Sequence, residues 1–268
     1  MDLALNGKRA LVTGSTSGIG QAIALALAAE GVAVVVHGRD ATRAAAVVDD
    51  IRADGGLAAT ATGDLTDDDA AAAVAQQATQ AFGGIDILVD NMGGTAATDG
   101  WSDPDPRDWM ALYDSNVLSA VRLIGALTPA MRTVGWGRVI QIGSGAHPNP
   151  LPQRAAYCAA KAALANLTVS LTKELSGTGI TVNTISPGPT DTDGFQDTAR
   201  AFAQHNGLGD DIAAATTALL AGPLANPSDR LVQPREIGAL VALLASPLAA
   251  SVNGANIRID GGAIPTVN

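Results

Sequence analysis

Short apolar runs alternate with longer helical stretches along the chain, and this alternation restricts the fold more than any other feature. The apolar runs predict strands at residues 9–13, 32–37, 57–62, 85–89, 138–142, 181–186 and 255–259. The stretches between them predict helices at residues 21–30, 40–53, 107–133, 155–175 and 234–245, with another after Thr66 and two Ala-rich helical pieces within 190–232. Asp40 is expected to cap the helix at 40–53. Strands separated by helices need crossover connections, which form parallel sheets covered on both faces. We expect one doubly wound α/β domain over residues 1–268, with a seven-stranded, mostly parallel sheet.

The first predicted strand ends in a glycine-rich turn, Gly14-Ser15-Thr16-Ser17-Gly18-Ile19-Gly20, which leads directly into a helix. Glycines at these points permit a tight turn and let the backbone approach a pyrophosphate at the helix N-terminus. The spacing is Gly-x-x-x-Gly-x-Gly rather than Gly-x-Gly-x-x-Gly. The prediction of a dinucleotide site therefore depends on the strand before the turn and the helix after it. The turn predicts a Rossmann-type domain that binds a dinucleotide.

The end of the second strand is where such a site contacts the adenosine ribose. The residues there, His37-Gly38-Arg39, lack the carboxylate that would bind the 2′-hydroxyl of NAD, whereas Arg39 can pair with a 2′-phosphate. This favours NADP(H) as the cofactor, with NAD(H) as the alternative. Arg39 could also be a solvated surface arginine that contacts no cofactor. Asp64, after the third strand, could contact the adenine or serve only as a turn residue. Thr66 is expected to cap the next helix, with Asp69 as its capping-box partner.

Tyr157 and Lys161 lie one turn apart on the same face of an Ala-rich predicted helix. A phenol has an unperturbed pKa of about 10, and a neighbouring cation lowers it, so the hydroxyl becomes a better proton donor to a carbonyl oxygen. The pair alone is weak evidence, because many helices carry a packed tyrosine beside a solvated lysine. Asn116 lies in the middle of another helix, where asparagine is unfavourable, and therefore has a local bonding role or a functional one.

Composition excludes several classes of function. The chain has 268 residues, 47% of them hydrophobic, and a net charge of -10, which argues against nucleic acid and against an anionic membrane surface as partners.

Cys158 is the only cysteine, so no intramolecular disulfide forms, and a small core residue is a better interpretation than a reactive thiol. Acidic residues at 67–69 suit a helix start rather than a metal site, and we expect no metal. With neither a signal peptide nor an uninterrupted transmembrane run in view, we expect a cytoplasmic protein.

Together these motifs resemble the short-chain dehydrogenase/reductase family, in its single-domain branch that includes 3-oxoacyl-carrier-protein reductase-like carbonyl reductases. The resemblance covers residues 7–262. The family's Thr-Gly-x-x-x-Gly-x-Gly turn, its Asn-Asn-Ala-Gly motif, its Tyr-x-x-x-Lys pair and its Pro-Gly turn match, in that order, Thr13 to Gly20, Asp90-Asn91-Met92-Gly93, Tyr157 with Lys161, and Pro187-Gly188. Asp90 and Met92 depart from the family pattern, and Ser17 stands where many NADP-preferring members have a basic residue.

The resemblance implies a catalytic set and a cofactor site. Tyr157 would be the general acid or base, Lys161 would lower its pKa and hold the nicotinamide ribose, Ser144 would orient the carbonyl oxygen, and Asn116 would hold a relay water. The implied cofactor-binding residues are Gly14, Ser15, Thr16, Ser17, Gly18, Ile19, Gly20, Arg39, Asp64, Leu65, Asn91, Gly93, Tyr157, Lys161, Pro187, Gly188, Thr190 and Thr192. The family also implies a homotetramer or homodimer that pairs its long helices.

We expect an oxidoreductase that uses NADP(H) to reduce a neutral ketone, aldehyde or keto-ester. Alternatives are an NAD-dependent alcohol dehydrogenase, a 3-oxoacyl-thioester reductase and a non-catalytic dinucleotide-binding regulator. Candidate pocket residues are mostly small or apolar, with no arginine placed to hold a carboxylate or phosphate, and segment 190–232 has the length of a functional lid. These candidates, besides the lid, are Gly94, Thr95, His147, Leu151, Pro189 and Phe195.

Overall fold

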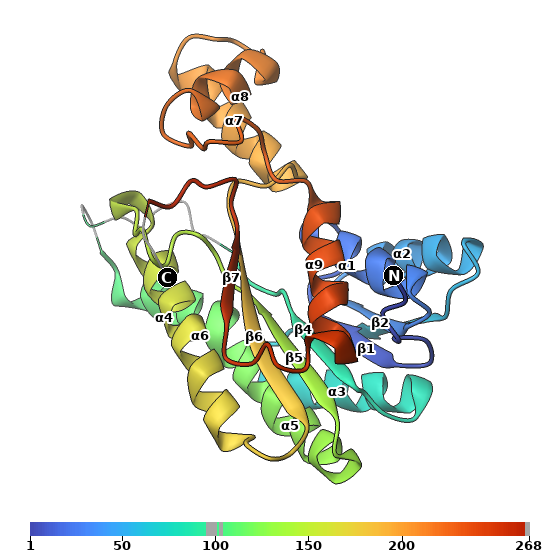
Figure 1. Ribbon diagram of the computed structural model, residues 1–268. Helices are drawn as coiled ribbons and strands as arrows, with labels where there is room; N and C mark the ends of the chain where they lie inside the picture. The colour runs from blue at the N-terminus through green and yellow to red at the C-terminus, as the bar shows by residue number, and fades with distance from the viewer. Residues whose placement is uncertain (95–100, 102–103, 266–268) are drawn as a thin grey trace.

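Seven parallel strands form one sheet, in the order β3-β2-β1-β4-β5-β6-β7, in a computed structural model that describes residues 1–94, 101 and 104–265 (Figure 1). The strands are β1 (Arg9–Val12), β2 (Ala33–Gly38), β3 (Ala58–Thr62), β4 (Ile87–Asp90), β5 (Gly137–Ile142), β6 (Ile180–Pro187) and β7 (Asn256–Ile259). The predicted seven-stranded, doubly wound sheet is confirmed, and every strand pairing is parallel. Thr95 lies outside the described residues.

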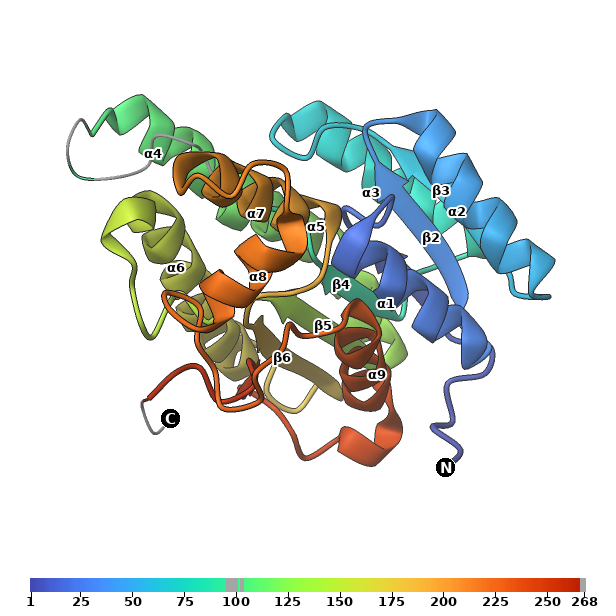
Figure 2. The same cartoon turned by 90° about the horizontal axis from the view of Figure 1, so that it is seen from above.

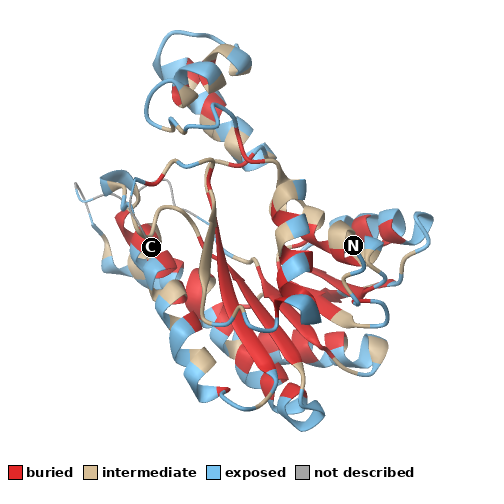
Figure 3. Cartoon of the chain, viewed as in Figure 1, coloured by how far each residue is buried: buried red, intermediate tan, exposed pale blue. Residues whose placement is uncertain are grey.

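Helices cover both faces of the sheet (Figure 2). One face carries α1 (Gly18–Ala29), α2 (Ala41–Ala53) and α9 (Pro234–Ala245), and the other carries α3 (Asp68–Phe82), α5 (Ser119–Val134) and α6 (Ala155–Glu174). Strand β2 shows why the sheet is buried on both sides: Val34 and Val36 pack into the first layer, and Val35 packs into the second. All six residues of β2 are buried, and the sheet forms the continuous buried centre seen in Figure 3.

Helix α4 (Pro106–Tyr113) runs into α5 through a short π-helical segment, Asp114–Leu118. The sequence predicts one helix here, and the structure interrupts it with a wider turn at the position of Asn116. Together these elements span Pro106–Val134, which is long and apolar enough to cross a membrane by length and composition alone. In the fold this stretch packs its inner side against α3 and α6, as the core helix of a globular protein does.

Two helix starts differ in how well the sequence predicted them. Asp40 caps α2 as expected, because its carboxylate accepts from the backbone N–H groups of Thr42 and Arg43. The prediction that Thr66 caps α3 is wrong: Asp67 is the cap and accepts from the N–H of Ala70 at 2.8 Å. The Thr66 hydroxyl instead donates to Asp64 at 2.8 Å, because the loop turns one residue later than the capping-box pattern implies.

The segment at 190–232 contains α7 (Asp193–His205) and α8 (Ile212–Leu220), which lie beyond the carboxyl edge of the sheet (Figure 1). The helices pack on each other through their own small apolar cluster of Ala199, Ala203, Ala215 and Leu219. Both ends of the segment are held together, since Thr190 pairs with Val232 in an isolated parallel bridge. The two helical pieces predicted in this segment are therefore present.

The order of the sheet reverses between β1 and β4, which lie side by side although β2 and β3 separate them in the chain. Connections from these two strands leave toward opposite faces, so a crevice opens beyond their carboxyl ends. The glycine-rich turn follows β1 and the Asp90-Asn91-Met92-Gly93 stretch follows β4. The topology thus brings these two motifs to one place.

Close packing of α1 on α9 predicts opposite effects for the same substitution at two glycines. A Cβ on Gly238 would lie 2.8 Å from the Ala22 carbonyl oxygen and 2.9 Å from the Ala26 Cβ, whereas a Cβ on Gly125 would have no heavy atom within 4 Å. We expect Gly238→Ala to lower the free energy of unfolding by about 1–3 kcal/mol through overpacking, and Gly125→Ala to raise it by up to about 1 kcal/mol. Thermal or denaturant unfolding measures both, and equal effects would contradict the packing argument.

Candidate active site

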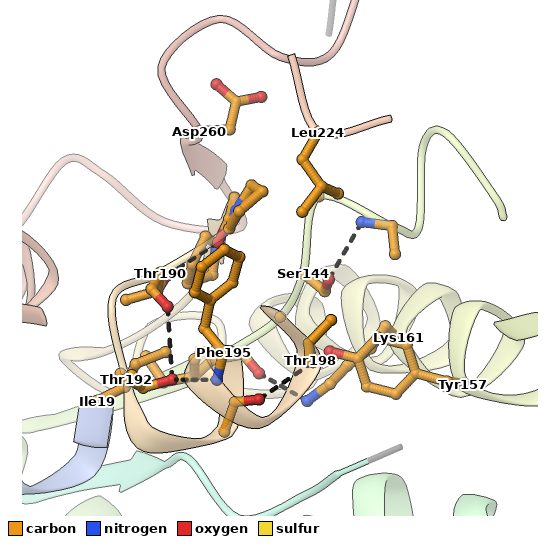
Figure 4. Close-up of a pocket in the computed structure, with 18 of the residues that line it drawn as sticks. Ile19, Ser144, Tyr157, Lys161, Thr190, Thr192, Phe195, Thr198, Leu224 and Asp260 are labelled. Carbon is orange, nitrogen blue, oxygen red and sulfur yellow. Dashed lines mark hydrogen bonds between the residues drawn. The ribbon is translucent and has the colours of Figure 1, made fainter. Parts of the chain in front are cut away.

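A cavity of about 680 Å³ lies beyond the carboxyl ends of β4, β5 and β6, between the glycine-rich turn and α7. Figure 4 shows Ser144, Tyr157 and Lys161 on one side of this cavity, with Thr190, Thr192 and Phe195 across from them. Of the predicted site residues, those that line it are Ser17, Gly18, Ile19, Gly20, Asn91, Gly93, Ser144, Tyr157, Lys161, Pro187, Gly188, Thr190 and Thr192. The predicted residues that do not line it are Gly14, Ser15, Thr16, Arg39, Asp64, Leu65 and Asn116.

The glycine-rich turn needs its glycines for two separate reasons. Gly14 and Gly18 have φ values of +58° and +55°, which side chains with a Cβ rarely adopt. Gly20 is required by close approach, because a Cβ there would overlap the Gly14 carbonyl and lie 2.5 Å from the Asn91 side-chain nitrogen. Asn91 in turn donates to the carbonyls of Thr13 and Gly14 at 3.0 and 3.1 Å. The turn is therefore tied to the end of β4.

A second tie runs through the Thr13 hydroxyl. Its oxygen accepts from the backbone N–H groups of Asn91 and Met92, both at 2.9 Å, and its hydrogen is donated to the Asp90 carboxyl at 3.0 Å. Asp90 thus has the polar donor that a buried carboxyl group needs. Burial raises the pKa of Asp90 to about 6, against the opposing effects of the Thr13 hydrogen bond and of the charge on Lys161.

The hydroxyl of Ser15 and the ring of His37 are used inside the fold, beneath the turn. Ser15 donates to the Val12 carbonyl at 2.7 Å and accepts from the His37 N–H at 2.9 Å. Gly14 donates its N–H to His37 Nδ1 at 3.2 Å, so the hydrogen of the neutral ring is on Nε2, which faces the Gly63 carbonyl. Burial lowers the pKa of His37, which agrees with a structural rather than an acid–base role.

Asn116 explains the π-helical segment in which it lies. Its amide donates to the Leu112 carbonyl at 2.9 Å and to the Gly94 carbonyl at 3.1 Å, and its Oδ1 accepts from the Gly94 N–H at 3.3 Å. The side chain thus fastens the segment that follows β4 to the helix, and the wider π turn accommodates it. The local bonding role expected for a mid-helix asparagine is present.

Lys161 is 4% exposed and donates to the Ile142 carbonyl at 2.9 Å. Burial lowers the pKa of Lys161 to about 8, and the nearby Asp90 carboxylate opposes this effect. Its ammonium lies 5.8 Å from the centre of the Tyr157 ring. The lysine is therefore a buried cation beside the tyrosine, with Asp90 as the acidic group that influences it.

Tyr157 is hydrogen-bonded to Ser144, so these two hydroxyls already lie together. Burial raises the pKa of Tyr157, while the Ser144 hydrogen bond and the charge of Arg154 act in the opposite direction. The sequence led us to expect a pKa lowered by Lys161; in the structure burial is the largest influence on the pKa of Tyr157, and it acts in the opposite direction. The phenol is thus protonated at neutral pH and can donate a proton.

The residues predicted to contact the adenosine, Arg39, Asp64 and Leu65, follow the ends of β2 and β3. Gly38 has no room for a side chain, because a Cβ there would lie 2.5 Å from Thr16 Cγ2. The Arg39 side chain is 77% exposed and lies 3.9 Å from the Asp64 carboxylate. Leu65 is fully buried, and its carbonyl accepts from the Arg122 guanidinium at 3.2 Å, so no part of Leu65 is exposed to a ligand. Packing against Thr16 thus accounts for the missing carboxylate at position 38.

Thr190 and Thr192 hold the start of the segment at 190–232. The Thr190 hydroxyl donates to the Gly188 carbonyl at 2.9 Å, and the Thr192 hydroxyl accepts from the Phe195 N–H at 3.3 Å as the cap of α7. Gly188 itself is required by close approach, because a Cβ there would lie 2.8 Å from Asp260 Cα. These residues bring α7 to the mouth of the cavity.

The substrate side of the cavity corrects one expectation. Gly94, Leu151, Pro189 and Phe195 line it as predicted, but Arg154 lines it as well. The sequence could have indicated Arg154, since it lies one turn before Tyr157 in the chain. Arg154 was missed because the residues before it resemble a loop in the sequence. In the structure Pro152–Arg154 form a 3₁₀ turn that leads into α6.

The sequence predicted no role for Asn149 and predicted His147 in the pocket, and the structure differs on both. Asn149 lines the cavity, although nothing in its sequence context marks it. His147 does not line the cavity; its Nε2 lies 2.8 Å from the Asn256 side-chain nitrogen. Burial lowers the pKa of His147, which leaves a neutral ring that joins the loop after β5 to β7.

Comparison with known proteins decides the family. A family model described as short chain dehydrogenase matches residues 8–202. The chain belongs to the short-chain dehydrogenase/reductase family. The 3-oxoacyl-[acyl-carrier-protein] reductase of Vibrio cholerae is 35% identical over 259 residues, covering 96% of this chain and 98% of that protein.

Solved structures of the short-chain dehydrogenase/reductase family superimpose on the whole chain. L-sorbose reductase from Gluconobacter frateurii, complexed with NADPH and L-sorbose, has a TM-score of 0.94 at 30% identity, with full coverage of both chains. A 7α-hydroxysteroid dehydrogenase complexed with NADH and 7-oxo glycochenodeoxycholic acid has a TM-score of 0.86 at 31% identity, covering 100% of this chain and 98% of that one. The protein is an oxidoreductase of this family, whose structural neighbours bind nicotinamide dinucleotides.

The buried Asp90 predicts a change in the titration of Lys161. Asn at position 90 still offers an oxygen to the Thr13 hydroxyl, so we expect Asp90→Asn to fold, but its removal of the negative charge should lower the pKa of Lys161 from about 8. The chain has three lysines, Lys8, Lys161 and Lys173, so ¹³Cε lysine NMR can follow each one against pH. The Lys173 signal, at the other end of α6, serves as internal reference. An unchanged Lys161 midpoint would show that Asp90 does not act on it.

Proposed function

We propose that this protein uses NADP(H) to reduce a neutral carbonyl compound, with Tyr157 as the general acid. The observation that carries the proposal is the hydrogen-bonded Ser144–Tyr157 pair beside buried Lys161, in the same cavity as the glycine-rich turn. The raised pKa of Tyr157 keeps the phenol protonated, which suits reduction. When bound, the nicotinamide cofactor supplies the hydride.

The residues of this chain then have distinct tasks. Gly18 and Gly20 admit the pyrophosphate to the start of α1, and Gly93 leaves room beside Asn116 and Lys161. The hydroxyls of Ser144 and Tyr157 orient the carbonyl oxygen, and Tyr157 gives it a proton. Lys161 returns a proton to Tyr157 and holds the nicotinamide ribose. Asn116 holds a water that links Lys161 to solvent as a proton relay.

The polar groups of the cavity favour a substrate that carries hydroxyl groups. Asn149, Arg154 and Thr198 add donors and acceptors to a wall that also contains Leu151 and Phe195. The structural neighbour complexed with L-sorbose supports a hydroxyketone as one member of the class to be tested. A 3-oxoacyl thioester is the second candidate, because the Vibrio cholerae relative is a 3-oxoacyl-[acyl-carrier-protein] reductase.

Segment 190–232 fits a lid over this cavity. Phe195, Thr198, Leu219 and Leu224 all line the cavity from this segment. Its ends are pinned where Asp191 donates to the Val232 carbonyl at 2.9 Å, so the two helices can move as a unit about that point. Closure of such a unit would exclude water from the reacting groups.

We further propose a cytoplasmic homotetramer or homodimer. The outer sides of α4, α5 and α6 expose the apolar side chains of Met110, Tyr113, Val121 and Val169, which supports pairing of these helices. The family resemblance implies the same pairing. The net charge of -10 keeps the assembly soluble.

The role of Tyr157 is tested by a matched pair of substitutions, because the chain has only two tyrosines. Tyr157→Phe removes the proton donor and should lower kcat by about a hundredfold to ten-thousandfold, with NADPH affinity nearly unchanged. Tyr113→Phe, at a half-exposed surface position, should keep full activity. Oxidation of NADPH is followed with ketones, ketoses, aldehydes, keto-esters and a 3-oxoacyl thioester. Wild-type protein that binds NADPH but reduces none of them would favour the non-catalytic regulator.

Cofactor preference depends on Arg39. Arg39→Gln should weaken NADPH binding by about ten- to a hundredfold, because a charge-assisted pair with the 2′-phosphate is lost, and should leave NADH binding unchanged. Arg43→Gln, an exposed arginine in the first turn of α2, is the matched control. Thermal shifts with each cofactor measure both. A larger shift with NADH in the wild type would replace this proposal with the NAD-dependent alcohol dehydrogenase.

A further inference from the structure

A second cavity, of about 640 Å³, lies at the opposite edge of the sheet from the active site. It is formed by the connections that lead into β5, β6 and β7, and it shares no lining residue with the active-site cavity in the part of the chain that the structure describes. Its polar lining comes chiefly from Arg138, Thr172, Lys173, Ser176 and Asn253. The catalytic chemistry uses none of these residues.

Arg138 is the unusual member of this group. It is 2% exposed, yet among the described residues its buried Nε has no hydrogen-bond partner. Nη1 donates to the carbonyls of Gly137 and Gly179 at 2.8 and 3.3 Å, and the guanidinium lies 4.4 Å from the centre of the Trp136 ring. These contacts are to neutral groups. A buried charge without a counter-charge is unfavourable, so an anionic partner would stabilise the buried guanidinium of Arg138.

Two carboxylates on the elements around Arg138 are already engaged elsewhere. Asp86, whose backbone carbonyl accepts from the Arg138 N–H, directs its carboxylate to Arg9 at 2.8 Å. Glu174 pairs with Arg132 at 2.9 Å. Burial lowers the pKa of Arg138, and no acidic group among the described residues opposes that effect. The part of the chain that the structure describes therefore supplies no counter-ion for Arg138.

The cavity is also positive where the rest of the protein is acidic. The chain has 26 acidic and 16 basic side chains, yet the described lining of this cavity includes Arg138 and Lys173 and no Asp or Glu. Lys8 adds a third cation nearby, with its ammonium 3.9 Å from the centre of the Trp136 ring. Such a local concentration of positive charge attracts anions.

The neutral polar groups also favour an acceptor as ligand. Asn253 accepts from the Val182 N–H through its Oδ1 at 2.8 Å, which directs its NH₂ group away from that bond. The exposed hydroxyl of Ser176 adds another donor. Guanidinium, ammonium, amide and hydroxyl donors on one cavity match the acceptor oxygens of a carboxylate or phosphate.

We propose that this cavity binds a small oxyanion, a carboxylate or a phosphate, with Arg138 as the principal partner and Lys173 as the second. The site is separate from the cofactor site and lies at the amino ends of β5 and β6, whose carboxyl ends carry Ser144 and Pro187. Binding here would neutralise the buried guanidinium and stabilise the fold.

The test uses the holoprotein with saturating NADPH, so that the cofactor site is occupied. Thermal shift and calorimetric titration are run with inorganic phosphate and, separately, with citrate, at constant ionic strength with chloride as reference. We expect a saturable shift with at least one of these anions, and the stronger one identifies the preferred oxyanion. Non-specific salt effects rise without saturation and do not depend on Arg138.

Substitutions decide which residues bind the anion. Arg138→Gln should weaken anion binding at least tenfold, and Lys173→Gln, at an exposed position, should weaken it several-fold; the second variant keeps the test decisive if the first does not fold. Arg43→Gln should leave anion binding unchanged. Absence of a saturable shift in the wild type would overturn the proposal. So would a shift that survives in Lys173→Gln and any folded Arg138→Gln, or one lost in Arg43→Gln.

Discussion

The Asn91 side chain and the Thr13 hydroxyl join the ends of two strands that are distant in the chain, and the site depends on this junction. Asn91 donates to the carbonyls of Thr13 and Gly14, and the Thr13 hydroxyl accepts from the backbone after β4. Because β1 and β4 are the neighbours at which the sheet order reverses, the junction also shapes the crevice beyond their ends. Glycines at 14, 18 and 20 then leave that crevice open to a ligand.

Burial governs the chemistry of the groups around this junction. It raises the pKa of Asp90 to about 6, lowers that of Lys161 to about 8 and raises that of Tyr157. Each shift has the sign expected when a charge is moved out of water. The Asp90 carboxylate partly restores the cationic form of Lys161, which connects the departure from the family's Asn-Asn-Ala-Gly motif to the lysine beside Tyr157.

Sequence reasoning predicted the elements well and their ends less well. The seven strands, the Asp40 cap and the two helices within 190–232 are confirmed, because periodicity and caps are properties of short stretches. Thr66 was the wrong cap, since one residue of difference in the loop moves the helix start to Asp67. The π segment at Asn116 was unpredictable, because it depends on a bond to Gly94 from a distant part of the chain.

The sequence by itself determined the alternation of strands and helices, the glycine-rich turn and the Tyr157–Lys161 spacing, because each is encoded within a few consecutive residues. Only the tertiary structure decided the protonation preferences of these groups, since burial and distant neighbours set them. It alone also placed Arg154 in the active-site cavity and left the buried Arg138 without a carboxylate partner among the described residues. In the sequence both arginines resemble ordinary surface residues. Folding decides how far each is removed from water and which groups lie beside it, and these determine its role.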